Sequence, residues 1–431
     1  MTGNHYSETT KRFFLAAKNA ELTGLNQLAS NCKLVGVVSD MIHQLQKERG
    51  TSNVFLASRC TQFGQKRASQ ISQSQNSEER LRSQLKALYL NGHESLSNMR
   101  LLSSITLALQ GIDHLPELRK KVDELSVTPL TSTQAYCRLI ASLLSVVFDA
   151  ADVSGDPEIT RLLVALFNFI QAKEYAGQER AWGAIGFAET HFNKSLCERL
   201  HQLQTAQTQS IDIFLSFAHK DDVEKWQALE ASKQVEELDQ MRNMICQLAD
   251  GTPIAAEISE VWYDLATTRI DMMHNVEETL IERMLCCANQ KVELAEQTLN
   301  DHSKRLKALA GATKDHNGAL TLLFDPNLPG LRGADSTRQT DAETDASLSV
   351  NRSIYALLRE QSENIKKMSH ELEEAKQAIT DQKLVDRAKL VLMQQLDMTE
   401  EQAYRKLQKS AMDQHCKLIE VAQNVLAVTR R

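Results

Sequence analysis

The chain has 431 residues, a formal net charge of −7 and few helix breakers, with 16 glycines and 6 prolines. Average proteins contain about 7% Gly and about 5% Pro, so this composition predicts an almost wholly helical chain. No apolar run approaches the ~18 residues of a membrane span, and the N-terminus lacks the apolar stretch of a signal peptide. We therefore expect a cytoplasmic protein with no membrane contact.

Side chains with chemical reactivity do not gather in a recognisable constellation. The eight cysteines contain no CysXxxXxxCys pair, and the twelve histidines show no metal-ligand spacing. The sequence also lacks a Gly-rich phosphate loop and a nucleophile elbow. We therefore expect no metal, no cofactor and no enzyme activity.

Helical patterns follow one another through the first 310 residues. Helices are predicted at about 8–30, 32–58, 79–91, 95–111, 114–126, 132–152, 157–184, 188–218, 222–248 and 256–309. Prolines and glycines at about 325–333 then predict a flexible linker. The expected fold is all-α, with a helical domain in residues 1–310, a linker at 311–350 and a C-terminal domain at 351–431.

The N-terminal domain contains an internal repeat with an offset of 131 residues, which relates residues 47–50 to residues 178–181. In each copy an arginine, Arg49 or Arg180, interrupts a helical stripe that should face a bundle core. A small residue follows one turn later, Ser52 or Gly183, and leaves space beside the cation. A buried cation needs a partner. Either a buried ion pair with a glutamate of a neighbouring helix, Glu48 or Glu179, or a small planar oxyanion held by the guanidinium forks would supply one.

Four motifs in this domain resemble the NIT domain, a nitrate- and nitrite-sensing module. They lie at residues 46–58, 136–144, 174–181 and 262–271, and the resemblance spans about residues 30–290. It implies two helical bundles and a nitrate or nitrite ligand. Arg49 and Arg180 inherit the anion-binding role from the two Glu-Arg motifs. Arg242 and Arg269 are further candidates, for which an ordinary surface charge is the alternative.

A heptad pattern follows the linker. Leu358, Ile365, Leu372 and Ile379 recur every seven residues, with partly polar residues in the second seam. The pattern predicts a coiled-coil helix, and a parallel pair would make the protein a homodimer. The alternative is that this stripe packs against its own chain.

The last segment, residues 383–431, predicts three short amphipathic helices with cations on their outward positions. It carries +3, against −10 for the rest of the chain. A basic module on an acidic body is typical of nucleic-acid contact, and a solvated helical face is the alternative. The candidate RNA contacts are Arg387, Lys389, Arg405, Lys406, Lys409 and Lys417.

Motifs between Asp386 and Ala422 resemble the ANTAR domain, an RNA-binding antiterminator module, over residues 362–426. Leu390 and Gln408 depart from the usual pattern, in which Gly and Arg are common at these positions. Together the two domains resemble nitrate-responsive transcription antiterminators. The resemblance implies a leader-RNA stem-loop as partner and control of nitrate-assimilation genes. The alternative is a helical protein-interaction scaffold without a small-molecule ligand. A phosphorylation-controlled antiterminator is disfavoured, because its receiver domain would need strands that residues 1–310 do not predict.

Overall fold

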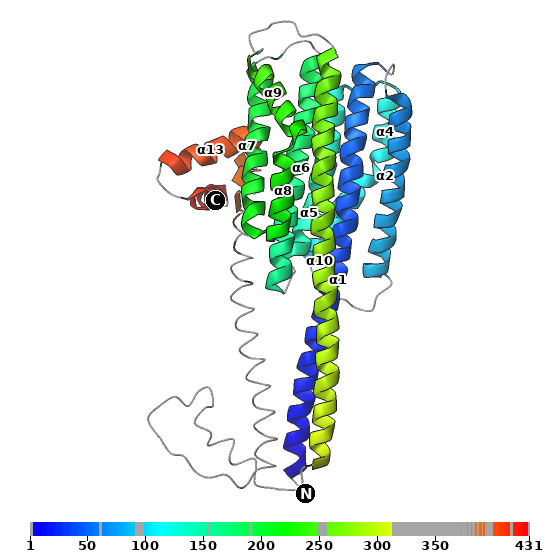
Figure 1. The fold of residues 1–431 in the computed structure, drawn as a ribbon, viewed down its shortest axis with the longest axis vertical. Coiled ribbons are helices and arrows are strands. Elements are labelled where there is room, and N and C mark those ends of the chain that lie inside the picture. Colours follow the sequence, from blue (N-terminus) through cyan, green and yellow to red (C-terminus); the bar gives the residue numbers. More distant parts are fainter. Residues whose placement is uncertain are drawn as a thin grey trace. The chain divides into compact units, whose positions relative to one another are not determined.

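The computed structural model describes residues 3–59, 63–90, 99–152, 156–188, 192, 194–247, 257–312, 400–413 and 417–429, together with single residues between 372 and 392. The secondary structure in these ranges is helical (Figure 1), which confirms the predicted all-α class. Within the same ranges, no helix combines the length and the apolar character that crossing a membrane requires.

The first half of the N-terminal domain begins with α1, which joins two predicted helices into one. Pro116 stands where the third helix of this half is interrupted, since a proline removes a backbone donor and clashes with the preceding turn. The elements are α1 (Gly3–Ala57), α2 (Gly64–Leu85) with a π-helical turn at Lys86–Leu90, α3 (Met99–Asp113), α4 (Leu115–Asp123) and α5 (Pro129–Asp152).

The second half repeats this order of two long helices, an interrupted third and a fourth. The Asp156 side chain caps its first helix by accepting a hydrogen bond of 3.0 Å from the backbone N–H of Ile159. The elements are α6 (Pro157–Ala188), α7 (Lys194–Phe217), α8 (Lys220–Glu230), α9 (Lys233–Gln247) and α10 (Glu257–Ala312). The single helix predicted at 222–248 was wrong, because the chain turns at Ala231 and Ser232.

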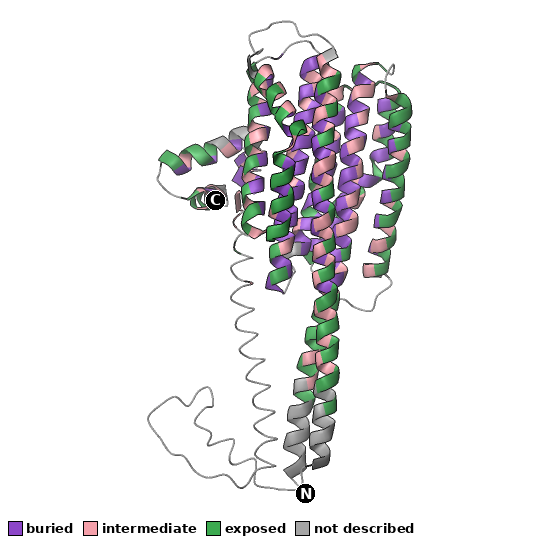
Figure 2. Cartoon of the chain, viewed as in Figure 1, coloured by how far each residue is buried: buried purple, intermediate pink, exposed green. Residues whose placement is uncertain are grey.

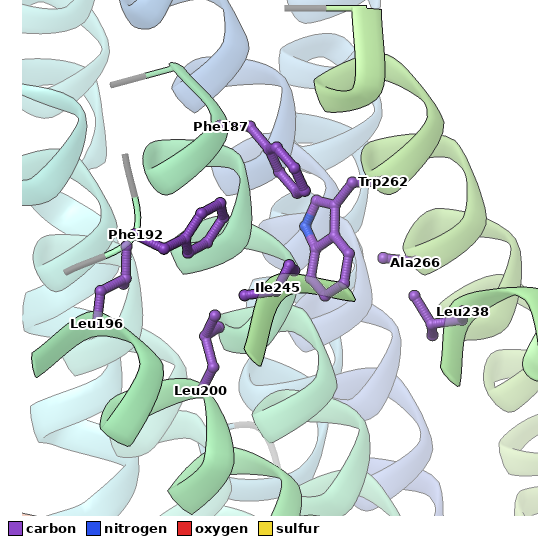
Figure 3. Close-up of a cluster of buried hydrophobic side chains, with 8 residues drawn as sticks. All are labelled: Phe187, Phe192, Leu196, Leu200, Leu238, Ile245, Trp262 and Ala266. Atoms are coloured by element: carbon purple, nitrogen blue, oxygen red, sulfur yellow. The ribbon is translucent and has the colours of Figure 1, made fainter. Parts of the chain in front are cut away.

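Apolar packing holds these bundles together, and Figure 2 shows the buried faces of the helices turned toward one another. One cluster in the second bundle is drawn in Figure 3, where the Trp262 indole of α10 lies among side chains of α6, α7 and α9. A Cβ atom at Gly183 would lie 2.4 Å from this indole. Glycine is therefore required at position 183 for α6 and α10 to approach this closely.

The chain divides into two compact units, residues 1–27 with 288–371 and residues 28–287 with 372–431. In the first unit, none of the described side chains between residues 12 and 27 is buried. Residues 311 and 312 still belong to α10, and the rest of the predicted linker lies outside the described residues. Most of the predicted heptad stretch also lies outside them. The coiled coil, the domain boundaries and the homodimer therefore stay predictions.

The C-terminal module has an apolar core of its own. It is built from Ala388 and Leu392 together with α13 (Glu400–Asp413) and α14 (Leu418–Thr429). From the last two helices, Ala403, Leu407 and Val421 are buried in this core. The spacing of Ala403 and Leu407 follows the helical repeat of four residues, as the amphipathic pattern predicted.

Candidate functional site

Arg49 on α1 and Arg180 on α6 are the most deeply buried arginines among the described residues of the N-terminal domain. Their exposed fractions are 0% and 2%. Each lies in the C-terminal part of a long helix, and its guanidinium is bonded to groups of other helices. The structure thus confirms that both arginines face a bundle core, as their stripes predicted.

Arg49 is paired with a carboxylate. Its Nη1 lies 2.5 Å from Glu174 Oε1, and its Nη2 lies 3.2 Å from Glu174 Oε2. Nη1 also donates to Cys137 Sγ over 3.1 Å. Burial raises the pKa of Cys137 to about 11, so this thiol is neutral at physiological pH.

Arg180 is held by neutral groups. Its Nη1 donates to Thr267 Oγ1 over 2.9 Å, and its Nη2 donates to the backbone carbonyl of Gln46 over 3.1 Å. The guanidinium carbon lies 5.0 Å from the ring centroid of Tyr263. Among the described residues no carboxylate lies within ion-pair distance of Arg180. Its charge is therefore spread over dipoles and an aromatic face of that part of the chain.

The two arginines are arranged as a pseudo-symmetric pair. A Cβ at Gly177 would lie 2.5 Å from Arg49 Nη2, and a Cβ at Gly50 would lie 2.5 Å from Arg180 Nη2. Arg180 also bonds to the carbonyl of Gln46, and Gln46 and Gly177 are equivalent positions of the repeat. Each guanidinium thus lies against the backbone of the opposite helix, where glycine permits the close approach.

The glutamates that precede the arginines have other partners. Glu48 accepts from Arg119 Nε and Nη2 over 2.8 and 2.9 Å, and Glu179 accepts from Arg242 Nε and Nη2 over 2.8 and 2.6 Å. The ion pairs expected for Arg49 and Arg180 with Glu48 or Glu179 are therefore not formed. The reason is geometric, since successive residues of a helix point to different faces. In each copy the glutamate faces the interrupted helix, α4 or α9.

Arg242 and Arg269, the two further candidates, lie in the second bundle. Arg242 forms the ion pair with Glu179, and its guanidinium lowers the pKa of that carboxylate against the opposing effect of burial. Arg269 is 5% exposed and donates to Gln207 Oε1 over 2.9 Å and to Glu230 Oε1 over 3.2 Å. Burial lowers the pKa of Arg269, with a smaller contribution from Arg242. Both guanidinium groups therefore have carboxylate partners, which Arg180 lacks among the described residues.

The spaces expected beside the small residues are filled. Trp262 occupies the space at Gly183, and its Nε1 donates to the backbone carbonyl of Arg180 over 3.2 Å. The Ser52 hydroxyl accepts from Arg67 Nε over 3.2 Å. The small residues therefore serve helix packing.

A second layer of buried polar side chains lies on α1, α6 and α10. Lys173 of α6 pairs with Glu277 of α10, and Ser39 of α1 donates to the same carboxylate. The His43 ring stacks on His274 with centroids 3.5 Å apart. Burial lowers the pKa of His43, and the nearby Lys173 lowers it further. His43 is therefore a neutral imidazole.

The side chains of Arg49 and Arg180 keep donors that no described group accepts. The buried Nε atoms of Arg49 and Arg180 have no hydrogen-bond partner among the described residues. The arginine pair and Glu174 together leave one positive charge uncompensated. A guanidinium fork offers paired donors to an anion that presents two oxygens in one plane. An anion of charge −1 would balance this site.

Several groups around the two arginines belong to the motifs of the NIT resemblance, although the motifs alone did not predict their role. The motifs at 136–144, 174–181 and 262–271 contain Cys137, Glu174, Tyr263 and Thr267. Reading the two copies position by position would have pointed to Glu174, which stands where the first copy has His43. The difference in charge between Glu174 and His43 is visible in the sequence. The pairing of Glu174 with Arg49 is not.

The cations of the C-terminal module divide into two groups. Lys406, Lys409 and Lys417 are exposed. Lys389 is 9% exposed, and its ammonium lies 6.0 Å from the ring centroid of Tyr404. Arg387 and the side chain of Arg405 lie outside the described residues. The exposed lysines lie on α13 and directly before α14.

Comparison with known proteins agrees with the two resemblances. The family described as "Nitrate and nitrite sensing" (NIT) matches residues 40–285, and the ANTAR domain family matches residues 373–426. A "Nitrate regulatory protein" of Klebsiella oxytoca is 28% identical over 420 residues, which cover 96% of this chain and 94% of the relative. A solved structure, "Structure of the NasR transcription antiterminator", aligns with a TM-score of 0.59 and 27% identity, covering 97% of this chain and 98% of that one. The chain therefore belongs to the nitrate- and nitrite-sensing NIT family and carries an ANTAR domain near its C-terminus.

Proposed function

We propose that this chain is a transcription antitermination regulator, not an enzyme, whose NIT domain binds nitrate or nitrite and whose ANTAR domain binds a leader-RNA stem-loop. The observation that carries the ligand assignment is Arg180, a buried guanidinium without a carboxylate partner in the described part of the chain, paired with Arg49 across α1 and α6. The family membership and the regulatory relatives support the same function. The anion serves as a signal, and no further cofactor is invoked.

The anion acts by binding one arrangement of the helices more tightly than another. It would bridge Arg49 on α1 and Arg180 on α6, so that the spacing of these helices depends on its presence. RNA binding then follows through the exposed lysines Lys406, Lys409 and Lys417. Proteins that recognise a particular RNA sequence mostly bind loops, because the major groove of an A-form helix is too narrow for side chains. Two copies of the chain would present two such modules.

Calorimetric titration of the purified chain with sodium nitrate and sodium nitrite tests the ligand, with sodium chloride as the control. Saturable one-site binding is expected for at least one of the two oxyanions. Arg180→Lys keeps the charge but loses the planar fork, so most of the affinity should disappear. A chain that binds neither oxyanion would instead be a scaffold.

A gel-shift series with leader RNA tests the other half of the function. Nitrate should tighten the complex with the parent chain and have no effect on the Arg180→Lys variant. Replacing Lys406 or Lys409 by Ala should reduce the slope of log affinity against log salt by about 0.7–0.9 for each phosphate that the lysine had neutralised. Lys233→Ala, at an exposed lysine of α9, is the matched control and should leave the slope unchanged.

A further inference from the structure

We propose that Glu174 is a built-in competitor of the anion, which occupies the Arg49 fork in the absence of ligand and sets the concentration at which the sensor responds. This inference rests on the proposed function. Arg49 Nη1 and Nη2 each face one oxygen of Glu174, at 2.5 and 3.2 Å. A carboxylate and nitrite or nitrate offer a guanidinium the same planar pair of oxygens.

Glu174 is held by groups that could equally hold an anion. Gln46 Nε2 donates to its Oε2 over 2.9 Å, and Gln178 Nε2 donates to its Oε1 over 2.9 Å. Glu174 is 2% exposed, so the carboxylate competes for Arg49 out of reach of bulk water. Such a carboxylate is a strong intramolecular rival to a dissolved anion, because it is already desolvated and oriented.

The pairing also joins two helices of the sensor. Arg49 and Gln46 belong to α1, whereas Glu174 and Gln178 belong to α6. An anion that takes the Arg49 fork must break this connection. Ligand binding is thereby linked to a change in the contacts between α1 and α6, which is the differential interaction that a two-state sensor requires. Glu174 would thus lower the affinity for the anion and raise the anion concentration at which the sensor responds.

Glu174→Gln tests the inference because it removes the charge while keeping the shape and an oxygen acceptor for Arg49. The variant should bind nitrate or nitrite at least about tenfold more tightly than the parent, since the rival charge is gone. It should also respond to the anion at proportionally lower concentrations in the RNA gel-shift assay. Glu48→Gln is the matched control, because Glu48 forms an equally buried pair with Arg119. It should leave the anion affinity within about twofold of the parent.

A Glu174→Gln chain that is folded by circular dichroism and binds the anion no more tightly than the parent would overturn the inference. If that variant does not fold, Glu174→Asp replaces it. Aspartate keeps the charge but shortens the reach to Arg49, so a gain of affinity is again expected and its absence is again decisive. A parent chain that binds neither oxyanion defeats the proposed function itself, which keeps the two failures apart.

Discussion

The two copies of the repeat place an arginine at the same position and give it different partners. Arg49 faces Glu174 of the other copy, whereas Arg180 faces neutral groups. The residue equivalent to Glu174 in the first copy is His43, which is neutral because burial and Lys173 lower its pKa. A nearly symmetric pair of helices therefore carries an asymmetric set of charges.

This difference separates the charge-balanced features of the repeat from the one position where charge is unbalanced. The pairs of Glu48 with Arg119 and of Glu179 with Arg242 are formed in both copies and are charge-balanced. At the arginine pair the copies differ in their carboxylate partner, and one positive charge remains. The symmetric buried ion pairs are those expected to stabilise the fold, and the unbalanced position is the one proposed above to bind the anion.

Replacing each arginine by alanine should give the largest difference in stability between changes in the two copies. Arg49→Ala leaves Glu174 buried without its cation, which should lower the free energy of unfolding by ~3–5 kcal/mol. Arg180→Ala strands no carboxylate among the described residues, so its cost should be clearly smaller. Both variants should lose the response to nitrate. Urea unfolding with calorimetry checks this, and equal destabilisation by the two changes would contradict the asymmetry.

Replacing His43 of the first copy by glutamate, the residue at the equivalent position of the second copy, should lower the affinity for nitrate. His43→Glu would place a negative charge near Arg180 and remove the net positive charge of the site. Nitrate affinity should then fall by at least about tenfold. His43→Gln, which stays neutral, is the control and should retain most of the affinity. The same affinity in both variants would show that position 43 does not act on Arg180 through charge.

Substituting a glycine where a guanidinium lies against the opposite helix should have a smaller effect. Gly50→Ala brings a Cβ to 2.5 Å from Arg180 Nη2 and 2.8 Å from Tyr263 Oη. Displacing these groups should cost ~1–3 kcal/mol of unfolding free energy and reduce nitrate affinity. Gly24→Ala, where nothing lies within 4 Å, should instead stabilise the helix by ~0.5–1 kcal/mol. Thermal unfolding of both variants, with and without nitrate, distinguishes a site effect from a general helix effect.

The neutral histidine should also shape the dependence of stability on pH. The pKa of His43 is lower in the folded chain than in the unfolded chain, so below pH ~6.5 the unfolded chain binds a proton that the folded chain does not. Unfolding free energy should therefore fall with decreasing pH, by up to about 1.4 kcal/mol per unit from this residue. The groups around it are Lys173, His274, Lys47 and Arg180. His43→Gln should flatten the slope, and a slope unchanged by this substitution would assign the effect to another group.

The sequence predicted the fold class and the two central arginines because both depend on periodic patterns. A cation within an apolar stripe marks a buried charge wherever the stripe packs. The partner of that charge could not be predicted, since Arg49 and Glu174 are 125 residues apart and meet only through the register of α1 against α6. Helical periodicity predicts which face of a helix is buried. It does not predict which turn of the neighbouring helix lies opposite a given residue.

Two local features escaped prediction for other reasons. The turn at Ala231 and Ser232 contains neither Pro nor Gly, so nothing in the composition marks the end of α8. Lys389 was assigned to the outward face of its helix, yet it is largely buried beside Tyr404. A lysine stem is apolar and long enough to pack over a core, and a charge pattern does not reveal this. Lys389 as an RNA contact stays a prediction, and the exposed lysines are better placed to reach a phosphate.

The fusion of both bundles into one polypeptide has a consequence for the range of charges that the site can adopt. Two identical subunits related by a twofold axis would present the same residue at both positions. Such a dimer would carry two glutamates and no net charge, or two histidines and a charge of +2. A single chain that encodes the halves separately can place one glutamate and one histidine, and thereby reach +1. Matching a monovalent ligand is thus possible here because the internal symmetry is approximate.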